Sequence, residues 1–191
     1  MKEEYFKNKF RTNSIRLQDW DYTWPAMYYV TICTKDRACC LGEVKNELVY
    51  LSEIGKVVFE ELLKTPELRP YVKLDDFIIM PNHIHIIFEL KEDKDFDMEG
   101  RDTARHVSTQ RKFGNAQPKS LSSIIASFKS AVSKHCHEKN LDFQWQNNYY
   151  EHIIRDEEDY ARIKEYIAAN PAKWAEDRNN PINFKKIISN P

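Results

Sequence analysis

The chain of 191 residues is long enough for one domain with a real hydrophobic core, but too short for two independent enzyme lobes. It contains four glycines and no GxGxxG or Walker-type pattern, which argues against a glycine-rich loop that cradles a nucleotide phosphate. The formal net charge is −1, so overall charge gives no argument for nucleic-acid binding, and any phosphate-binding surface must be local.

The cysteines and the apolar runs narrow the class of protein further. Cys33, Cys39, Cys40 and Cys136 form no C-x-x-C pair and no disulfide framework, so neither a zinc ribbon nor a disulfide scaffold is indicated. No apolar run approaches the roughly 20 residues that cross a bilayer, and "MKEEYFKNKFRTNS" has no hydrophobic segment for secretion. We therefore expect a cytoplasmic protein that does not act at a membrane.

The first part of the chain predicts an arm followed by a strand, a hairpin and a helix. Residues 1–27 mix basic and aromatic residues without periodicity, which is typical of an arm that packs on a domain or contacts nucleic acid. The run "YYVTICTK", Tyr28–Lys35, predicts the first strand of one domain that spans residues 28–191. "LGEVKNELVYL" predicts a short hairpin. Ser52 is then a candidate N-cap of an amphipathic helix, which we expect to end at Pro66.

The second part predicts a hairpin, an insertion and two further helices. The apolar runs "YVKLDDFIIM" and "HIHIIFEL" are separated only by "PN", which indicates a central antiparallel hairpin. Residues 91–118 are charged, polar and aperiodic, and predict a flexible insertion. Apolar residues recur at helical spacing from Ser120 to Asn140. The extended segment "FQWQNNYYEHIIR" follows, and a last helix starts at the candidate N-cap Asp156 and stops at Pro171.

This order of elements predicts an α+β fold. Strand, helix, two strands, helix and strand form a βαββαβ unit, the ferredoxin-like or RRM-like plan, in which two helices cover one face of an antiparallel sheet. The last helix is an addition to that plan at the C-terminus.

Two histidines interrupt the second apolar run of the central hairpin. Because successive side chains of a strand point to opposite faces, His83 and His85 share one face, while Ile84 and Ile86 share the other. Two neutral imidazoles on a rigid strand can place nitrogens about 2 Å from one divalent ion, with open positions for water or phosphate oxygens. A third ligand is still needed, and a hydrogen-bonded structural pair is an open alternative.

The last helix offers that ligand beside a possible nucleophile. Tyr166 and Asn170 are one turn apart, so the phenol and the carboxamide project from the same helical face. An amide oxygen is a competent ligand for Mg²⁺ or Mn²⁺, and a tyrosine beside the ion is a potential nucleophile. Taken alone, the same pair also suits an amphipathic helix with a capping Asn.

Three ordered blocks carry a resemblance to a known family. "PNHIHIIFE" is similar to the histidine-hydrophobic-histidine motif of the HUH single-tyrosine transposases, and "EYIAANPAKW" resembles their catalytic helix with its Y-x-x-x-N/Q pattern. "NSIRLQDWDYTWPAMYYVTICTKDR", "MPNHIHIIFEL" and "WQNNYYEHIIRDEEDYARIKEYIAANPAKW" resemble, in that order, the REP-associated tyrosine transposases, or RAYTs. The likeness covers most of the chain outside residues 91–118. Asn170 stands where the wider family usually has Gln, as it does in RAYTs.

The resemblance implies an activity and assigns its residues. His83, His85 and Asn170 would hold Mg²⁺ or Mn²⁺, and Tyr166, on what is then a catalytic helix, would attack DNA. The family's reaction cuts single-stranded or hairpin DNA, such as repetitive extragenic palindromes, and leaves a 5′-phosphotyrosine intermediate and a free 3′-OH that permits strand transfer. Tyr149, Tyr150 and Tyr160 are alternative nucleophiles by position. Of these four tyrosines, only Tyr166 is followed four residues later by an Asn.

Basic and aromatic residues outside this centre are candidates for contacts with DNA phosphates and bases, and a homodimer is compatible with the sequence. These candidates are Arg11, Arg16, Trp20, Tyr22, Lys129, Lys134, His152, Arg155 and Lys173.

Two other classes of protein remain as alternatives. An RRM-like module would bind nucleic acid on its sheet without cutting it, and would leave Tyr166 idle. A cupin also has an H-x-H followed by Glu, here Glu89, but the expected glycines are absent and two amphipathic helices occupy the places of strands.

Overall fold

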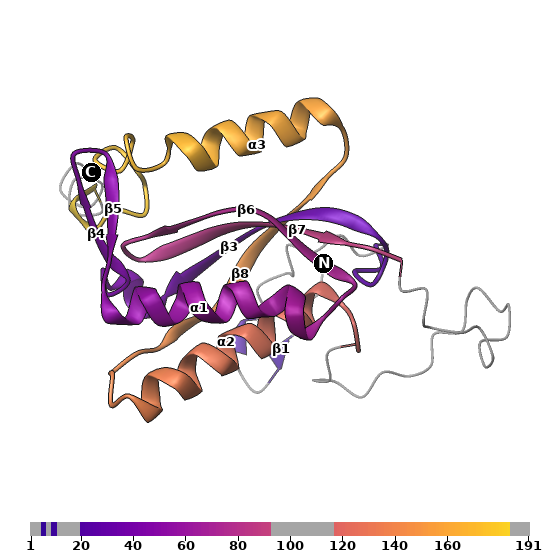
Figure 1. Ribbon diagram of the computed structural model, residues 1–191, viewed down its shortest axis with the longest axis horizontal. Helices are drawn as coiled ribbons and strands as arrows, with labels where there is room; N and C mark the ends of the chain where they lie inside the picture. The colour runs from indigo at the N-terminus through magenta and orange to yellow at the C-terminus, as the bar shows by residue number, and fades with distance from the viewer. Residues whose placement is uncertain (1–4, 7–8, 11–19, 93–116, 184–191) are drawn as a thin grey trace, which may run out of the picture.

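The computed structural model describes residues 5–6, 9–10, 20–92 and 117–183 (Figure 1). Its centre is a four-stranded sheet in the order β6-β7-β3-β8, in which every neighbouring pair is antiparallel. This is the strand order of a βαββαβ unit and confirms the predicted ferredoxin-like α+β class. The four strands are β3 (Ala26–Thr34), β6 (Val72–Met80), β7 (His83–Leu90) and β8 (Trp145–Ile154).

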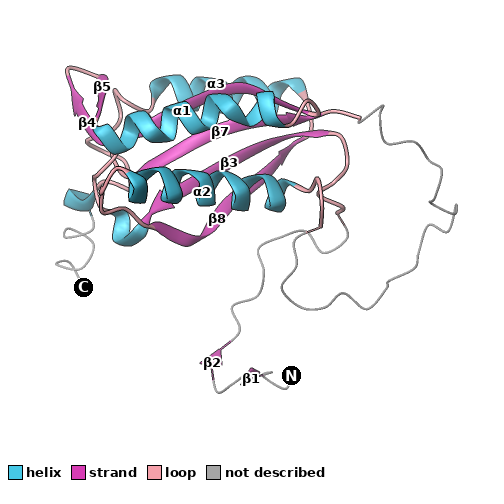
Figure 2. Ribbon diagram, turned by 60° about the horizontal axis from the view of Figure 1, so that its bottom comes forward, coloured by secondary structure: helices cyan, strands magenta, loops and turns pink. Residues whose placement is uncertain are grey.

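Three helices lie on the two faces of this sheet. Helices α1 (Glu53–Leu68) and α2 (Leu121–Glu138) cover one face, and α3 (Glu157–Ala169) lies on the opposite face (Figures 1 and 2). The remaining elements are small. They are the hairpin of β4 (Gly42–Lys45) and β5 (Leu48–Leu51), the turn η1 (Lys35–Arg37), and the pair β1 (Tyr5–Phe6) and β2 (Lys9–Phe10).

The predicted helix starts are correct, and one predicted end is wrong. Ser52 accepts a hydrogen bond from the backbone N–H of Gly55, and Asp156 caps α3 through the N–H of Asp159. Helix α1, however, continues through Pro66 to Leu68. A proline in the last turn removes a single backbone donor, so this helix runs two residues past it.

Other sequence predictions differ only at their boundaries or lie outside the described residues. The first strand begins at Ala26, two residues before the predicted start, and α2 begins after Ser120 as its N-cap. The predicted insertion at residues 91–118 falls largely on residues 93–116, which the structure does not describe. In the described part of the chain, no helix has the length and apolarity needed to span a bilayer.

Alternation along the strands builds two separate apolar layers. Even-numbered residues of β7, such as Ile84 and Ile86, pack against α1 and α2 in the larger layer. Ile87 belongs to the smaller layer under α3. That layer consists of Tyr29, Ile87, Ile154, Ile163 and Ile167.

We expect the smaller layer to set the position of α3. Ile167 is 2% exposed in it, so Ile167→Ala should lower the free energy of unfolding by about 2–4 kcal/mol through lost contacts and a residual cavity. Ile182→Ala is the matched control, because Ile182 is 68% exposed and its truncation should change stability by no more than about 0.5 kcal/mol. Urea unfolding measures both variants, and equal losses would contradict this account of α3 docking.

Candidate active site

The two histidines of β7 lie buried side by side on the sheet face that α3 covers. His83 is fully buried and His85 is 2% exposed. Their Nε2 atoms are 3.0 Å apart, while Ile84 and Ile86 point into the opposite apolar layer, as the alternation predicts. Two ring nitrogens at this distance either share one proton or flank one cation.

Asn82, in the turn between β6 and β7, fixes the protonation of His83. Its Nδ2 donates to the carbonyls of Arg37 at 3.0 Å and Asn179 at 2.7 Å, so its Oδ1 must be the atom that faces His83 Nδ1 at 2.8 Å. A carboxamide oxygen only accepts hydrogen bonds. His83 therefore carries its proton on Nδ1 and presents the lone pair of Nε2 toward His85.

His85 has a different environment on its far nitrogen. Its Nδ1 is 2.6 Å from the Tyr29 hydroxyl and 2.8 Å from Thr31 Oγ1, both on the neighbouring strand β3. Since His83 offers a lone pair, His85 donates its Nε2–H to it when nothing lies between them, and Nδ1 then accepts from a hydroxyl. Hydroxyl groups can also accept, so the same partners suit the opposite tautomer of His85.

Burial keeps both rings neutral. Loss of hydration lowers the pKa of His83 to about 4, although the nearby Asp177 carboxylate acts in the opposite direction. Burial and the neighbouring His83 lower the pKa of His85 well below its ordinary value. Neutral imidazoles are the form that binds divalent metal ions.

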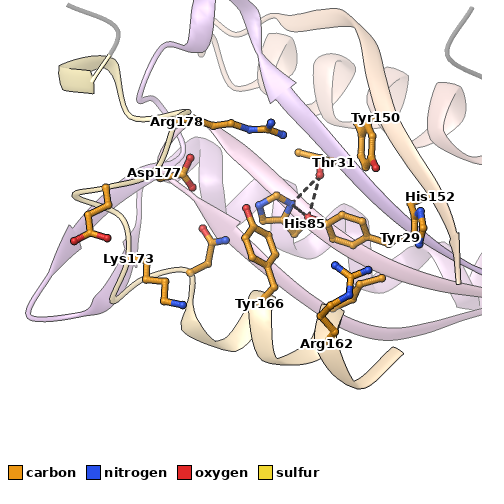
Figure 3. A pocket seen from close by; sticks show the side chains of 13 residues that line it. Tyr29, Thr31, His85, Tyr150, His152, Arg162, Tyr166, Lys173, Asp177 and Arg178 are labelled. Carbon is orange, nitrogen blue, oxygen red and sulfur yellow. Dashed lines mark hydrogen bonds between the residues drawn. The ribbon is translucent and has the colours of Figure 1, made fainter. Parts of the chain in front are cut away.

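Helix α3 brings the predicted tyrosine and asparagine to these imidazoles. The Tyr166 ring centroid lies 5.2 Å from that of His85, and its side chain is 44% exposed (Figure 3). Asn170, one turn later, is 3% exposed, and its buried Oδ1 has no hydrogen-bond partner. A buried unpartnered amide oxygen costs about 1–3 kcal/mol, a cost that a hydrogen-bond donor or a cation in the pocket would remove.

An open pocket of about 670 Å³ contains this centre. Tyr166 stands beside His85 in it, with Arg162 and Tyr150 on one side and Asp177 and Arg178 on the other (Figure 3). Its wall carries aromatic rings and the cations Arg162, Lys173 and Arg178, which suit the bases and phosphates of a nucleic acid, together with the carboxylates of Glu176 and Asp177.

The donor set fits a hard divalent cation. His85 and the unpartnered amide oxygen of Asn170 line one pocket, and the buried His83 Nε2 lies 3.0 Å from His85 Nε2. Among the described residues, no three His, Cys, Asp or Glu side chains are grouped so that they could hold an ion on their own. The Asn170 amide oxygen is the unpartnered side-chain donor that the pocket offers beside the histidines.

The structure brings only some of the predicted DNA contacts to this pocket. His152 and Lys173 line it, and His152 Nε2 is 2.6 Å from Asp159. Arg155 is exposed just after β8. Arg11 and Arg16 lie outside the described residues.

The other predicted contacts have local structural partners. Trp20 and Tyr22 pack on the larger apolar layer, and Trp20 Nε1 donates to the Tyr28 hydroxyl at 3.1 Å. Lys129 donates to two backbone carbonyls of β8, and Lys134 pairs with Glu138 at 3.8 Å. Trp20 and Tyr22 thus act in packing.

Sequence reasoning missed several residues of the pocket. Tyr29 and Thr31 share the face of His85 through the register Thr31↔His85, so strand pairing would have indicated them. Asp177 and Arg178 arrive on an irregular segment after α3. No periodicity or motif marks such a segment, and only the folded chain shows where it lies.

Comparison with known proteins gives four informative matches. The chain is 35% identical over 179 residues to an uncharacterized protein of Haemophilus influenzae. This alignment covers 93% of this chain and 98% of that protein. It is 27% identical over 161 residues to a putative REP-associated tyrosine transposase of the same organism, covering 80% of this chain and 74% of that one. A REP-associated tyrosine transposase of Escherichia coli is 27% identical over 113 residues, 59% of this chain and 51% of that one.

A solved structure of a REP-associated tyrosine transposase bound to a REP hairpin superposes with a TM-score of 0.55 and 19% identity, covering 83% of this chain and 74% of that one. No protein-family model matches. Fold and sequence together define a transposase-like protein. The chain belongs to the same family as the 35% identical Haemophilus protein, and its similarity to the two proteins named REP-associated tyrosine transposase makes it RAYT-like.

The asymmetry of the two imidazoles can be measured directly. In metal-free protein, long-range ¹H–¹⁵N correlation spectra should show His83 protonated on Nδ1 and His85 on Nε2, because Asn82 Oδ1 accepts only from the former ring. His137, near the exposed end of α2, serves as the reference ring. A proton on Nε2 of His83 instead of Nδ1 would contradict the assigned orientation of Asn82.

Proposed function

We propose that this protein is a metal-dependent single-strand DNA endonuclease and strand transferase that acts on hairpin DNA through a 5′-phosphotyrosine intermediate. The observation that carries the proposal is that an exposed phenol and an unpartnered amide oxygen share one pocket with His85, whose neutral imidazole is paired with that of the buried His83. A relative of the same fold was solved with a REP hairpin, which supports folded DNA as the substrate class.

His83, His85 and Asn170 are the residues that would hold Mg²⁺ or Mn²⁺. Bound there, the ion supplies Lewis-acid stabilisation of the negative charge that develops on a scissile phosphate. The protein contributes the preorganisation: Asn82 orients one ring, Tyr29 and Thr31 orient the other, and burial keeps both rings neutral. All these groups come from one chain, so the proposed chemistry does not require a second subunit.

Tyr166 is the proposed nucleophile. Its oxygen forms a bond to phosphorus while the bond from phosphorus to the 3′ oxygen breaks, so the 5′ phosphate becomes attached to the enzyme and the 3′ oxygen leaves as a hydroxyl after taking up a proton. A phenol has an ordinary pKa near 10, so it must lose its own proton during attack. Exchange of one phosphodiester for another conserves bond energy, which permits strand joining without a nucleotide cofactor.

The alternative tyrosines have other environments. The Tyr160 hydroxyl donates to Asp75 Oδ2 at 2.8 Å, and Tyr149 packs in the apolar layer under α1 and α2. Tyr150 shares the pocket and is 47% exposed, with its ring 6.3 Å from that of Tyr29. Tyr150 is therefore the rival that an experiment must separate from Tyr166.

The second candidate function is a nucleic-acid-binding module that does not cut. The exposed Tyr150 on an open part of the sheet favours it, because RRM-like sheets stack bases on such aromatics. This candidate gives no role to the unpartnered oxygen of Asn170 or to the buried imidazole pair. The two functions differ in one product, a covalent protein–DNA adduct.

We expect Tyr166→Phe to bind single-stranded hairpin DNA with Mn²⁺ as the native protein does, but to form no adduct, since it lacks only the attacking oxygen. Tyr150→Phe is the matched control and should retain the adduct. Denaturing gels and mass spectrometry of a tyrosine-linked oligonucleotide measure the outcome. If Tyr166→Phe formed the adduct and Tyr150→Phe did not, the nucleophile would be Tyr150 on β8.

Asn170→Leu should separate stability from metal binding. Because Oδ1 is buried without a partner, replacing the amide should not lower the free energy of unfolding of the metal-free protein by more than about 1 kcal/mol. The stabilisation that Mn²⁺ confers on the native protein should largely vanish, since a ligand is gone. Thermal unfolding with and without Mn²⁺ tests this, and an unchanged metal-induced shift would remove Asn170 from the site.

A further inference from the structure

The carboxylate of Asp177 lies beside the imidazole pair and has no part in the assignments above. Its side chain is 7% exposed, and Oδ2 is 3.9 Å from His83 Nε2. Because His83 carries its proton on Nδ1, the nitrogen that faces this carboxylate bears a lone pair. That lone pair accepts from His85 in the metal-free protein, so His83 has no proton to donate to Asp177, and a cation between the rings or its bound water would stabilise the nearby carboxylate in this nearly dry site.

Hydrogen bonds through the buried Asn179 hold Asp177 in this place. Its Oδ1 accepts the backbone N–H of Asn179 at 2.6 Å, and the Asn179 carbonyl accepts Asn82 Nδ2 at 2.7 Å. Arg37 Nη1 donates to Asn179 Oδ1 at 2.7 Å. The same Asn82 that sets the tautomer of His83 therefore also ties down the segment that carries Asp177.

We propose that Asp177 is the acidic residue of the divalent-cation site and acts on the ion through a metal-bound water that donates to its Oδ2. This inference rests on the function proposed above and adds a residue to the same centre. His83, His85 and Asn170 are all neutral, and Asp177 is the buried carboxylate beside them, whereas Glu176 of the same pocket is exposed to solvent. Mg²⁺ and Mn²⁺ sites of this kind commonly keep several waters, and Mg²⁺ in particular is reluctant to lose them.

The water-mediated contact agrees with the geometry. At 3.9 Å from the imidazole nitrogen, the carboxylate is too distant for a hydrogen bond. It also forms no closed three-residue cluster with the histidines. A carboxylate in such a place adds charge and orients bound water without displacing the ligands.

Asp177→Asn tests the proposal in the full-length, DNA-free protein. Asn keeps an oxygen that can accept the Asn179 N–H, so the turn is preserved while the charge is removed. We expect the Kd for Mn²⁺, measured by calorimetry or by electron paramagnetic resonance of free Mn²⁺, to rise about tenfold or more. An unchanged melting temperature of the metal-free variant and an unshifted Asn179 amide signal would show that the hydrogen bonds through Asn179 remain.

Glu176→Gln is the matched control, because it removes one carboxylate from the adjacent position of the same pocket. Its Kd should change by less than about twofold, as expected for an exposed charge screened by solvent. Native affinity in Asp177→Asn, or equal losses in both variants, would overturn the role of Asp177 and leave the metal site standing. Absence of Mn²⁺ binding in the native protein would instead overturn the metal site, and with it this inference.

Discussion

The pairing of two neutral imidazoles in a dry part of the sheet is the constraint on which the rest of the site depends. Each ring needs a partner for its outer nitrogen, and the fold supplies Asn82 for one and the hydroxyls of β3 for the other. Those partners leave the inner nitrogens, 3.0 Å apart, aimed at a shared point. Without them the rings would need water, which the burial of both side chains excludes.

Helix α3 completes the centre because it is fixed at both its apolar face and its flank. Ile163 and Ile167 pack on Ile87 and Tyr29, and the Tyr160 hydroxyl reaches Asp75 on β6. This docking divides two residues of one helical face into different environments. Tyr166 remains exposed toward the pocket, whereas Asn170 is buried at its base. A nucleophile needs access to substrate and a metal ligand needs a rigid, dry position, so the division suits both roles.

Local sequence patterns predicted the fold class and the pairs His83/His85 and Tyr166/Asn170. They failed for features that depend on tertiary packing. Alternation placed His83 and His85 on one face, and helical spacing joined Tyr166 to Asn170, because both rules depend only on backbone geometry. The packing of the partly buried Trp20 did not follow from its polar and basic neighbours, since only the folded core shows which aromatic residues of an arm contact an apolar layer. Pro66 shows the same limit, because the cost of a proline depends on how much helix remains after it.

Helix α3 covers only part of the second face of the sheet. The same face can therefore hold a buried pair of histidines and an exposed aromatic residue. An open RRM-like face exposes aromatics to bases but offers water to every polar group, so buried neutral imidazoles could not be maintained there. Here α3 shields the sheet around His85 from solvent, while Tyr150 on the edge strand β8 is 47% exposed within the same pocket. The covered part favours electrostatic chemistry, and the open part leaves room for an extended nucleotide. The addition of one helix to a common sheet thus creates a boundary between buried and solvent-exposed surface, and the proposed attack of Tyr166 on a phosphate would take place there.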